Sequence, residues 1–285
     1  MYKIIEGKAL AEAVRSEVAR ETAVLSEKYG RRPCLAVILV GNDNASQTYV
    51  RNKEKACEIC GIKSAMYKFD GTVSEDILLE LIKELNNDGG IDGILCQLPL
   101  PKHINEDRIT DAVSPEKDVD GFSPVSLGRL LSGKDGFVPC TPAGIIELLK
   151  YADTPLSGRR CVIIGRSNIV GKPLSLLLLG ENATVTVCHS KTKELKDEVR
   201  RADIVIAAAG KEKLVTDDMI KDGATVIDVG INRNADGKLC GDVDFESVAP
   251  KCRAITPVPG GVGPMTVAML MKNTLKAFKN HNGIK

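Results

Sequence analysis

Strand-like stretches that alternate with helical stretches constrain the fold of this chain more than any other feature. The run Leu35–Val40 is continuously apolar and rich in branched side chains, as a strand buried on both faces requires. Apolar residues at helical spacing predict a helix before it, from about Lys8 to Tyr29. Further elements are expected at 46–60 (helix), 65–69 (strand), 74–85 (helix) and 93–98 (strand). This order predicts parallel strands with right-handed crossovers.

A second series follows a looser segment, residues 99–142, that is rich in Pro and Gly. A helix is expected to about Tyr151, with Thr141 as its N-cap and Pro142 at its first position. Strands are expected at 161–164, 184–188, 204–208, 225–229 and 255–258, and helices at 173–179, 194–201 and 264–278. We therefore predict an α/β fold with two domains, residues 1–143 and 144–263, and a cleft between them, where ligands commonly bind.

Composition narrows the classes of function. The formal net charge is +1, so no overall field attracts nucleic acid or a membrane surface. The chain has no run of about eighteen apolar residues, and its first residues look like neither a signal nor a transit peptide. Nine cysteines are scattered along the chain, and Cys57-x-x-Cys60 has no second pair nearby. We expect a cytoplasmic protein with no nucleic-acid partner, no membrane partner and no bound metal.

A glycine turn between a predicted strand and a predicted helix, Gly165–Gly171, favours a dinucleotide site. Backbone N–H groups at a helix start bind a pyrophosphate, and glycine allows its close approach. The spacing is not G-x-G-x-x-G, so an ordinary strand-to-helix turn remains an alternative. The next strand ends in Cys188–Thr192 without the carboxylate that holds the ribose of NAD. Arg166, Ser190 and Lys191 can instead accept a 2′-phosphate, which favours NADP.

Small residues close the third strand of this series, at Ala207–Gly210. They leave room for an adenine or a ribose to lie flat, or they serve only tight helix packing.

A candidate substrate site comes from the first series. Tyr49 and Lys53 are four residues apart on a predicted helix, so they share one face. Alone, the pair is more often a surface lysine beside a tyrosine. Gln97 ends the third strand of the same sheet, at the edge where open α/β sheets bind ligands. Asp120 adds a carboxylate nearby, and so does Asp118 unless it only caps a turn.

The segment Thr256–Thr266 combines three prolines with three glycines and leads into the last helix. It is either a rigid crossover or a loop that lines the cleft.

Together these segments resemble the bifunctional methylenetetrahydrofolate dehydrogenase/cyclohydrolase family. The segments run in family order across nearly the whole chain, without a departure at a key position. They are Tyr49–Lys53, Gln97–Pro101, Pro115–Gly121, Gly165–Pro173, Cys188–Thr192 and Pro257–Thr266.

The resemblance implies two reactions. NADP⁺ takes a hydride from 5,10-methylenetetrahydrofolate, and water then converts 5,10-methenyltetrahydrofolate to 10-formyltetrahydrofolate. Lys53 would be the central group of the hydration, because a cationic substrate next to a lysine favours the neutral amine. Gln97 would assist Lys53, Tyr49 would stack on the folate, and Asp120 would bind the pterin. Pro259 and Gly260 would border the substrate.

The resemblance also implies a Rossmann-like NADP-binding C-terminal domain. The last helix, residues 264–285, would return to the N-terminal substrate domain, and the enzyme would be a homodimer. The candidate cofactor-binding residues are Gly165, Arg166, Ser167, Gly171, Ser190 and Ile231. A monofunctional NAD-dependent dehydrogenase and a non-catalytic NADP-binding regulator are the alternatives. Lys53 and the absence of a carboxylate in Cys188–Thr192 argue against the first, and the Lys53/Gln97/Asp120 set argues against the second.

Overall fold

The computed structural model describes residues 2–284, except the side chains of residues 44 and 45. The chain divides into two compact units. The first, here called the six-stranded unit, comprises Met1–Ala11 and Thr141–Thr266. The second, here called the three-stranded unit, comprises Glu12–Cys140 and Val267–Lys285. No helix among the described residues is long and apolar enough to cross a membrane.

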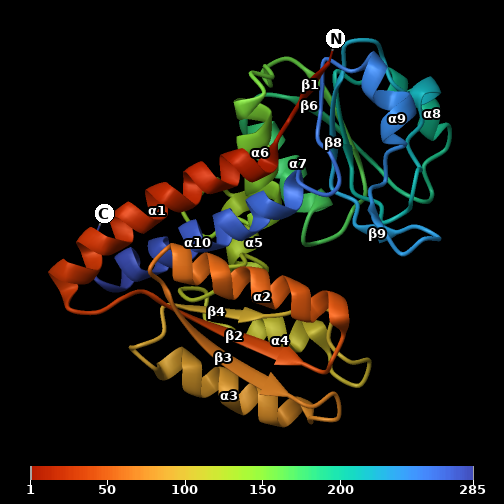
Figure 1. Cartoon of the computed structure of the whole chain (residues 1–285). Coiled ribbons are helices and arrows are strands. Elements are labelled where there is room, and N and C mark those ends of the chain that lie inside the picture. Colours follow the sequence, from red (N-terminus) through yellow and green to blue (C-terminus); the bar gives the residue numbers. More distant parts are fainter. Residues whose placement is uncertain (1, 285) are drawn as a thin grey trace. The chain divides into compact units, whose positions relative to one another are not determined.

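The three-stranded unit is built on a parallel sheet in the order β3-β2-β4. Alternate residues of the central strand β2, from Cys34 to Val40, pack in a core with α3 and α4. The residues between them face the opposite side of the sheet, where Figure 1 shows α2. The strands are β2 (Cys34–Val40), β3 (Lys63–Phe69) and β4 (Gly93–Cys96). The central strand is therefore buried on both faces, as its sequence predicts.

Three helices of this unit, α2, α4 and α5, begin at side-chain caps. Asp43 accepts a hydrogen bond from the Ser46 backbone N–H (2.8 Å), so α2 starts at Asn44, two residues before the predicted start. The helices are α1 (Gly7–Tyr29), α2 (Asn44–Ile59), α3 (Glu75–Asn87), α4 (Glu106–Ala112), α5 (Pro124–Leu131) and the second part of α10 (Val262–His281). The caps fix where α2 begins and therefore which of its residues face the sheet.

The six-stranded unit has a parallel sheet in the order β1-β11-β8-β7-β5-β6. Its strands are β1 (Lys3–Ile4), β5 (Arg160–Ile164), β6 (Thr184–Cys188), β7 (Ile204–Ala207), β8 (Thr225–Asp228) and β11 (Ala254–Ile255). Its helices are α6 (Cys140–Tyr151), α7 (Gly171–Gly180), α8 (Leu195–Arg200) and α9 (Phe245–Val248), with 3-10 turns at Asp217–Met219 and Ala249–Lys251. Counted along the chain from β5, the order is 2-1-3-4-5, a common doubly wound arrangement, with β1 added at the edge next to β11.

Several predicted bounds are wrong in detail. Helix α6 begins at Cys140, so Thr141 lies inside the helix and is not its N-cap. Helix α7 begins at Gly171, two residues before Pro173, because proline is tolerated anywhere in a first turn. The last strand is only β11, shorter than the predicted 255–258.

Two elements were not predicted from the sequence. β1 pairs with β11, which places the first residues of the chain in the six-stranded unit. The sequence division at residues 143 and 144 had assigned them to the other domain. A hairpin of β9 (Asn232–Arg233) and β10 (Leu239–Cys240) also follows β8.

Candidate active site

Lys53 is a buried lysine at the centre of the three-stranded unit. It lies on α2 with 8% of its surface exposed, and its Nζ donates to Gln97 Oε1 at 3.0 Å. Gln97 follows β4, and its Nε2 donates to the Leu98 carbonyl at 2.6 Å, which fixes the amide with its oxygen toward Lys53. A lysine is almost never fully buried unless its charged group has a partner. The predicted pairing of these two side chains is present.

Asp118 and Asp120 are close in sequence but differ in environment. The Asp118 carboxylate accepts hydrogen bonds from the backbone N–H groups of Gly121, Phe122 and Ser123, at 3.0, 3.1 and 2.9 Å. It also accepts one from Ser126 Oγ at 2.7 Å, so Asp118 shapes the turn before α5 and has no free oxygen for a ligand.

Asp120 is the reactive carboxyl of the two. Its pKa is raised to about 6: burial is the largest cause and the nearby charge of Asp118 adds to it, while the charge of Lys53 and a hydrogen bond with Cys140 oppose it. Asp120 and Lys53 therefore interact in the same site, and the carboxyl changes charge close to neutral pH.

Tyr49 lies one turn before Lys53 on α2. Its ring is partly buried, and burial raises the pKa of its hydroxyl above the ordinary value of 10.0, so it stays neutral at physiological pH. The i, i+4 spacing places it on the same face of α2 as Lys53. Tyr49, Lys53, Gln97 and Asp120, all predicted from the sequence, thus come from α2 and from the segments that follow β4.

Asn273 was not predicted to belong to the site. Its Nδ2 donates to the carbonyls of Val119 (2.8 Å) and Val138 (3.0 Å) and lies 3.6 Å from the Cys140 sulfur. It therefore holds the residue before Asp120 and the thiol that contacts Asp120. The signal in the sequence is an amide between Lys272 and Thr274 in the last helix, which is easily mistaken for an exposed position.

A second site is formed at the carboxyl ends of the strands in the six-stranded unit. β5 has β6 on one side and β7 on the other, so the strand order reverses there, which is where such sheets bind ligands. Gly165 follows β5 with φ +136°, and a Cβ there would lie 2.1 Å from the Ala208 carbonyl oxygen. A Cβ on Gly171 would lie 2.1 Å from the Gly165 carbonyl oxygen. Both glycines are therefore required by close backbone packing. This tight turn, here called the backbone cradle, leads into the start of α7, where backbone N–H groups can bind a pyrophosphate.

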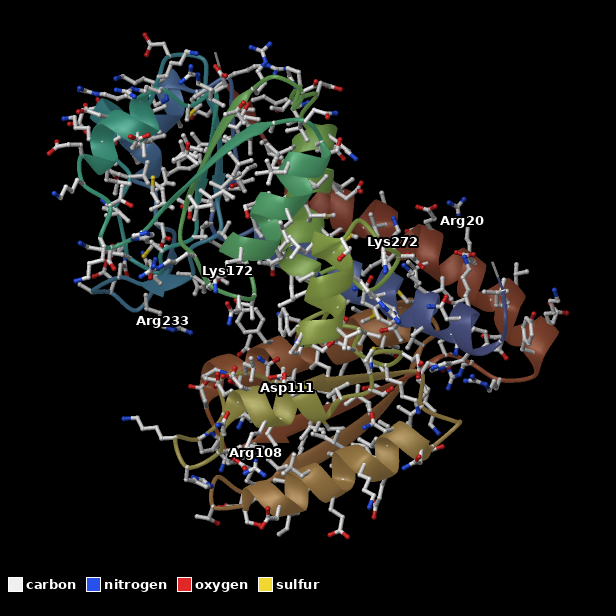
Figure 2. All side chains as sticks on the ribbon, turned by 180° about the vertical axis from the view of Figure 1, so that it is seen from behind. Arg20, Arg108, Asp111, Lys172, Arg233 and Lys272 are labelled. Atoms are coloured by element: carbon white, nitrogen blue, oxygen red, sulfur yellow. The ribbon has the colours of Figure 1, made fainter. Side chains whose placement is uncertain are left out.

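The side chains around this cradle are exposed. Arg166, Ser167, Ser190 and Lys191 all follow the carboxyl ends of β5 and β6, and Ile231 follows β8. Ser167 Oγ accepts from the Val170 N–H (3.1 Å) and so shapes the turn, and Lys172, at the start of α7 (Figure 2), donates to Asn168 Oδ1 at 2.7 Å. Within the described part of the chain Arg166 has no ion-pair partner, so its charge is available for a phosphate.

The proline–glycine loop belongs to the same unit as this cradle. Gly260 has φ +107°, and its carbonyl accepts from the Lys8 N–H at 3.1 Å. Gly7 packs so closely on the loop that a Cβ there would lie 1.8 Å from the Gly261 carbonyl oxygen. The start of α1 thus holds the loop that contains Pro259 and Gly260. These two residues lie in a different unit from Lys53.

Cys57 and Cys60 are both buried, and burial raises the pKa of their thiols to about 12 and about 11. Such thiols are poor nucleophiles and poor metal ligands. Among residues 2–284, no group of three or more His, Cys, Asp or Glu could hold a metal ion.

Comparison with known proteins agrees with both sites. The family model for the tetrahydrofolate dehydrogenase/cyclohydrolase catalytic domain matches residues 5–120, and the model for the NAD(P)-binding domain matches residues 139–282. A bifunctional protein FolD from Agathobacter rectalis is 60% identical over 279 residues, which cover 98% of this chain and 100% of that protein.

Solved structures agree in fold. The bifunctional enzyme FolD, a methylenetetrahydrofolate dehydrogenase/cyclohydrolase from Campylobacter jejuni, has a TM-score of 0.96 and 52% identity, covering 98% of this chain and 99% of that one. The Trypanosoma brucei enzyme, complexed with NADP cofactor and inhibitor, has a TM-score of 0.94 and 42% identity, covering 98% of each chain. The predicted α/β class and family are confirmed, and neither alternative function finds support. The chain belongs to the tetrahydrofolate dehydrogenase/cyclohydrolase family.

Proposed function

We propose that Lys53 moves the protons of the second of two reactions that this chain catalyses. The chain oxidises 5,10-methylenetetrahydrofolate to 5,10-methenyltetrahydrofolate with NADP, and it hydrolyses the product to 10-formyltetrahydrofolate. Membership of the family supports both activities. The observation that supports the role of Lys53 is its burial, with Nζ held by Gln97 at 3.0 Å and interacting with Asp120.

The oxidation needs little from acid–base groups. A hydride leaves the methylene carbon with its electron pair, and the two flanking nitrogens stabilise the cation that forms. NADP⁺ supplies the hydride acceptor when bound. Gly165 and Gly171 would hold its pyrophosphate, and Arg166 and Ser190 would hold its 2′-phosphate. Ser167 would shape the same turn, and Ile231 would contact the nucleotide from β8. Pro259 and Gly260 would border the reacting rings.

The hydrolysis needs proton transfers. Water forms a bond to the amidinium carbon and loses one proton. The bond from this carbon to N5 then breaks as N5 gains a proton and the new hydroxyl loses its own, which leaves a formyl group on N10 and releases one proton overall. Neutral Lys53 can accept the first proton and return it to N5. Gln97 Oε1 keeps the amine oriented, and Asp120 binds the donor groups of the pterin. Tyr49 would provide the face on which the pterin stacks.

Two broader properties belong to the same proposal. The enzyme acts in the cytoplasm, which the nine unpaired cysteines support, because reducing compartments keep thiols free. It acts as a homodimer, which light scattering of the purified protein would test.

Initial rates test the proposed function. The formation of reduced nucleotide from 5,10-methylenetetrahydrofolate is compared for NADP and NAD, and the loss of methenyltetrahydrofolate is followed separately. Lys53→Met is expected to slow hydrolysis by about a thousandfold and to keep NADP binding. Lys55→Met, an exposed lysine on the same helix, is the matched control and should hydrolyse at the wild-type rate. Hydrolysis at the wild-type rate by Lys53→Met would exclude this role, and a folded wild type without turnover would favour the regulator.

A further inference from the structure

Two buried carboxylates in the six-stranded unit lie outside every role described so far. Asp228 is the last residue of β8 and is 4% exposed, and Asp242 follows β10 and is fully buried. Neither side chain has a cation as its hydrogen-bond partner. A buried carboxylate without a cation is costly unless hydrogen-bond donors surround it, so the donors around these two residues show what they do.

Asp242 binds two loops at once. Its Oδ2 accepts from the backbone N–H groups of Ala209 (2.6 Å) and Gly210 (2.9 Å), and its Oδ1 accepts from that of Lys211 (2.9 Å). Its Oδ1 also accepts from Asn232 Nδ2 at 2.8 Å. Ala209–Lys211 follow β7, and Asn232 lies in β9, one residue after Ile231. One carboxylate therefore joins the turn after β7 to the segment after β8.

Asp228 holds Asp242 in turn. It accepts from the backbone N–H groups of Gly230 (3.0 Å), Asp242 (2.9 Å) and Val243 (3.0 Å). Burial raises its pKa to about 6, while the three N–H groups lower it. A Cβ on Gly241 would lie 1.8 Å from Asp228 Oδ2, and a Cβ on Gly230 would lie 2.2 Å from Asp242 Oδ1. Glycine at both positions is therefore a requirement of the two carboxylates.

Three consecutive backbone N–H groups that converge after a parallel strand make an anion-binding nest. In a nucleotide-binding domain such a nest is a natural phosphate site, but here Asp242 fills it. A phosphate cannot enter without displacing the carboxylate, and the like charges would repel each other. The pyrophosphate is left with the Gly165–Gly171 turn, and residues Ala208–Gly210 after β7 present only small apolar side chains and backbone.

We propose that Asp242 is a positioning residue that takes the place of a phosphate at the turn after β7 and shapes this turn, together with Ile231, for the uncharged nucleoside part of the cofactor. The proposal rests on the proposed NADP site. It gives the small residues Ala207–Gly210 a function beyond tight packing, and it explains why an exposed isoleucine follows β8.

Asp242→Asn tests this assignment because it keeps the size of the side chain and replaces an acceptor by a donor. The dissociation constant for NADPH, measured by titration, is expected to rise about tenfold. Hydrolysis of methenyltetrahydrofolate without nucleotide should keep its wild-type rate, because its residues lie in the three-stranded unit. Asp236→Asn, an exposed change of the same kind in the β9–β10 turn, is the control and should change neither quantity.

A folded Asp242→Asn protein with wild-type NADPH affinity would overturn the proposal. So would an equal loss of hydrolysis and NADPH binding, since that would indicate a merely structural role. If this variant does not fold, Asn232→Ala removes one donor and should raise the dissociation constant about threefold, and no change would be equally decisive. NADPH titration does not depend on turnover, so a wild type that binds NADPH without oxidising the folate would refute the proposed function and leave this test valid.

Discussion

The two compact units present their functional groups in different ways. In the three-stranded unit the groups are side chains: Lys53 is buried, Gln97 orients it, and Asp120 interacts with it. In the six-stranded unit the groups are largely backbone: Gly165 and Gly171 allow a turn that is too tight for a side chain at either position, and Asp242 occupies a nest of N–H groups. The side chains predicted to contact the nucleotide are exposed.

The difference follows from what each unit has to do. Proton transfer needs an ionisable group whose pKa suits the reaction, and burial is one way to shift that pKa. Binding a pyrophosphate needs converging N–H groups, which any sequence has, provided that no Cβ obstructs them. A substitution in the first unit should therefore change chemistry at constant cofactor affinity, and a substitution in the second should do the reverse.

Among substitutions in the six-stranded unit, Gly165→Ala should give the largest effect. The residue has φ +136°, and its new Cβ would lie 2.1 Å from the Ala208 carbonyl oxygen, so the turn has to move. The dissociation constant for NADPH is expected to rise about a hundredfold, while hydrolysis of methenyltetrahydrofolate stays within twofold.

Gly180→Ala is the matched control in the same unit. Gly180 is the last residue of α7 and has no atom within 4 Å of an added Cβ. This substitution should leave NADPH binding unchanged and stabilise α7 slightly. If Gly165→Ala kept full NADPH affinity, the cofactor site would not depend on the backbone cradle, and the comparison between the units would fail.

What could be predicted from the sequence follows the same division. Strongly apolar strands such as Leu35–Val40 were found with small errors at their ends. The Lys53–Gln97 pair was found because Lys53 lies on the helix after the first apolar strand and Gln97 comes at the end of another strand of the same sheet. β1 and the β9–β10 hairpin were missed, because strands of two residues have no periodicity.

Asp242 and Asn273 were missed for another reason. Asp242 contacts residues 31 to 33 positions earlier, and Asn273 contacts carbonyls 135 and 154 positions earlier. Neither residue has a local pattern that distinguishes it from an exposed polar residue. Residues that act by holding other residues are visible only once the chain is folded.

Asp120→Asn tests the buried carboxyl of the three-stranded unit through the pH dependence of stability. The pKa of Asp120 is raised to about 6 from its ordinary value of 3.8, so the folded protein binds this proton more tightly than the unfolded chain does. Its contribution to stability is present below about pH 4 and is lost as the pH rises through about 6. The neutral variant should match the wild type at pH 4 and exceed its free energy of unfolding by about 3 kcal/mol at pH 8.

Thermal unfolding followed by circular dichroism between pH 4 and pH 8 measures this difference. Asp228, whose pKa is also raised to about 6, contributes to both proteins and cancels in the comparison. Equal stability at pH 8 would mean that Asp120 is solvated in the folded protein. The variant should also bind the folate more weakly. Weaker binding would show that the Asp120 carboxylate destabilises the folded protein but contributes to substrate binding.

Arg166→Ala should have the smallest effect, and it tests the one place where the six-stranded unit is expected to depend on a side chain. Arg166 is exposed at the carboxyl end of β5, and removing its charge should raise KM for NADP about tenfold and leave KM for NAD within twofold. Arg159→Ala, an exposed arginine just before the amino end of the same strand, is the control and should change neither value. An equal loss for both nucleotides would place Arg166 at the pyrophosphate that they share. The preference for NADP would then come from Ser190 and Lys191, which follow β6. Side chains would still determine which nucleotide binds, whereas the backbone provides the binding that both nucleotides share.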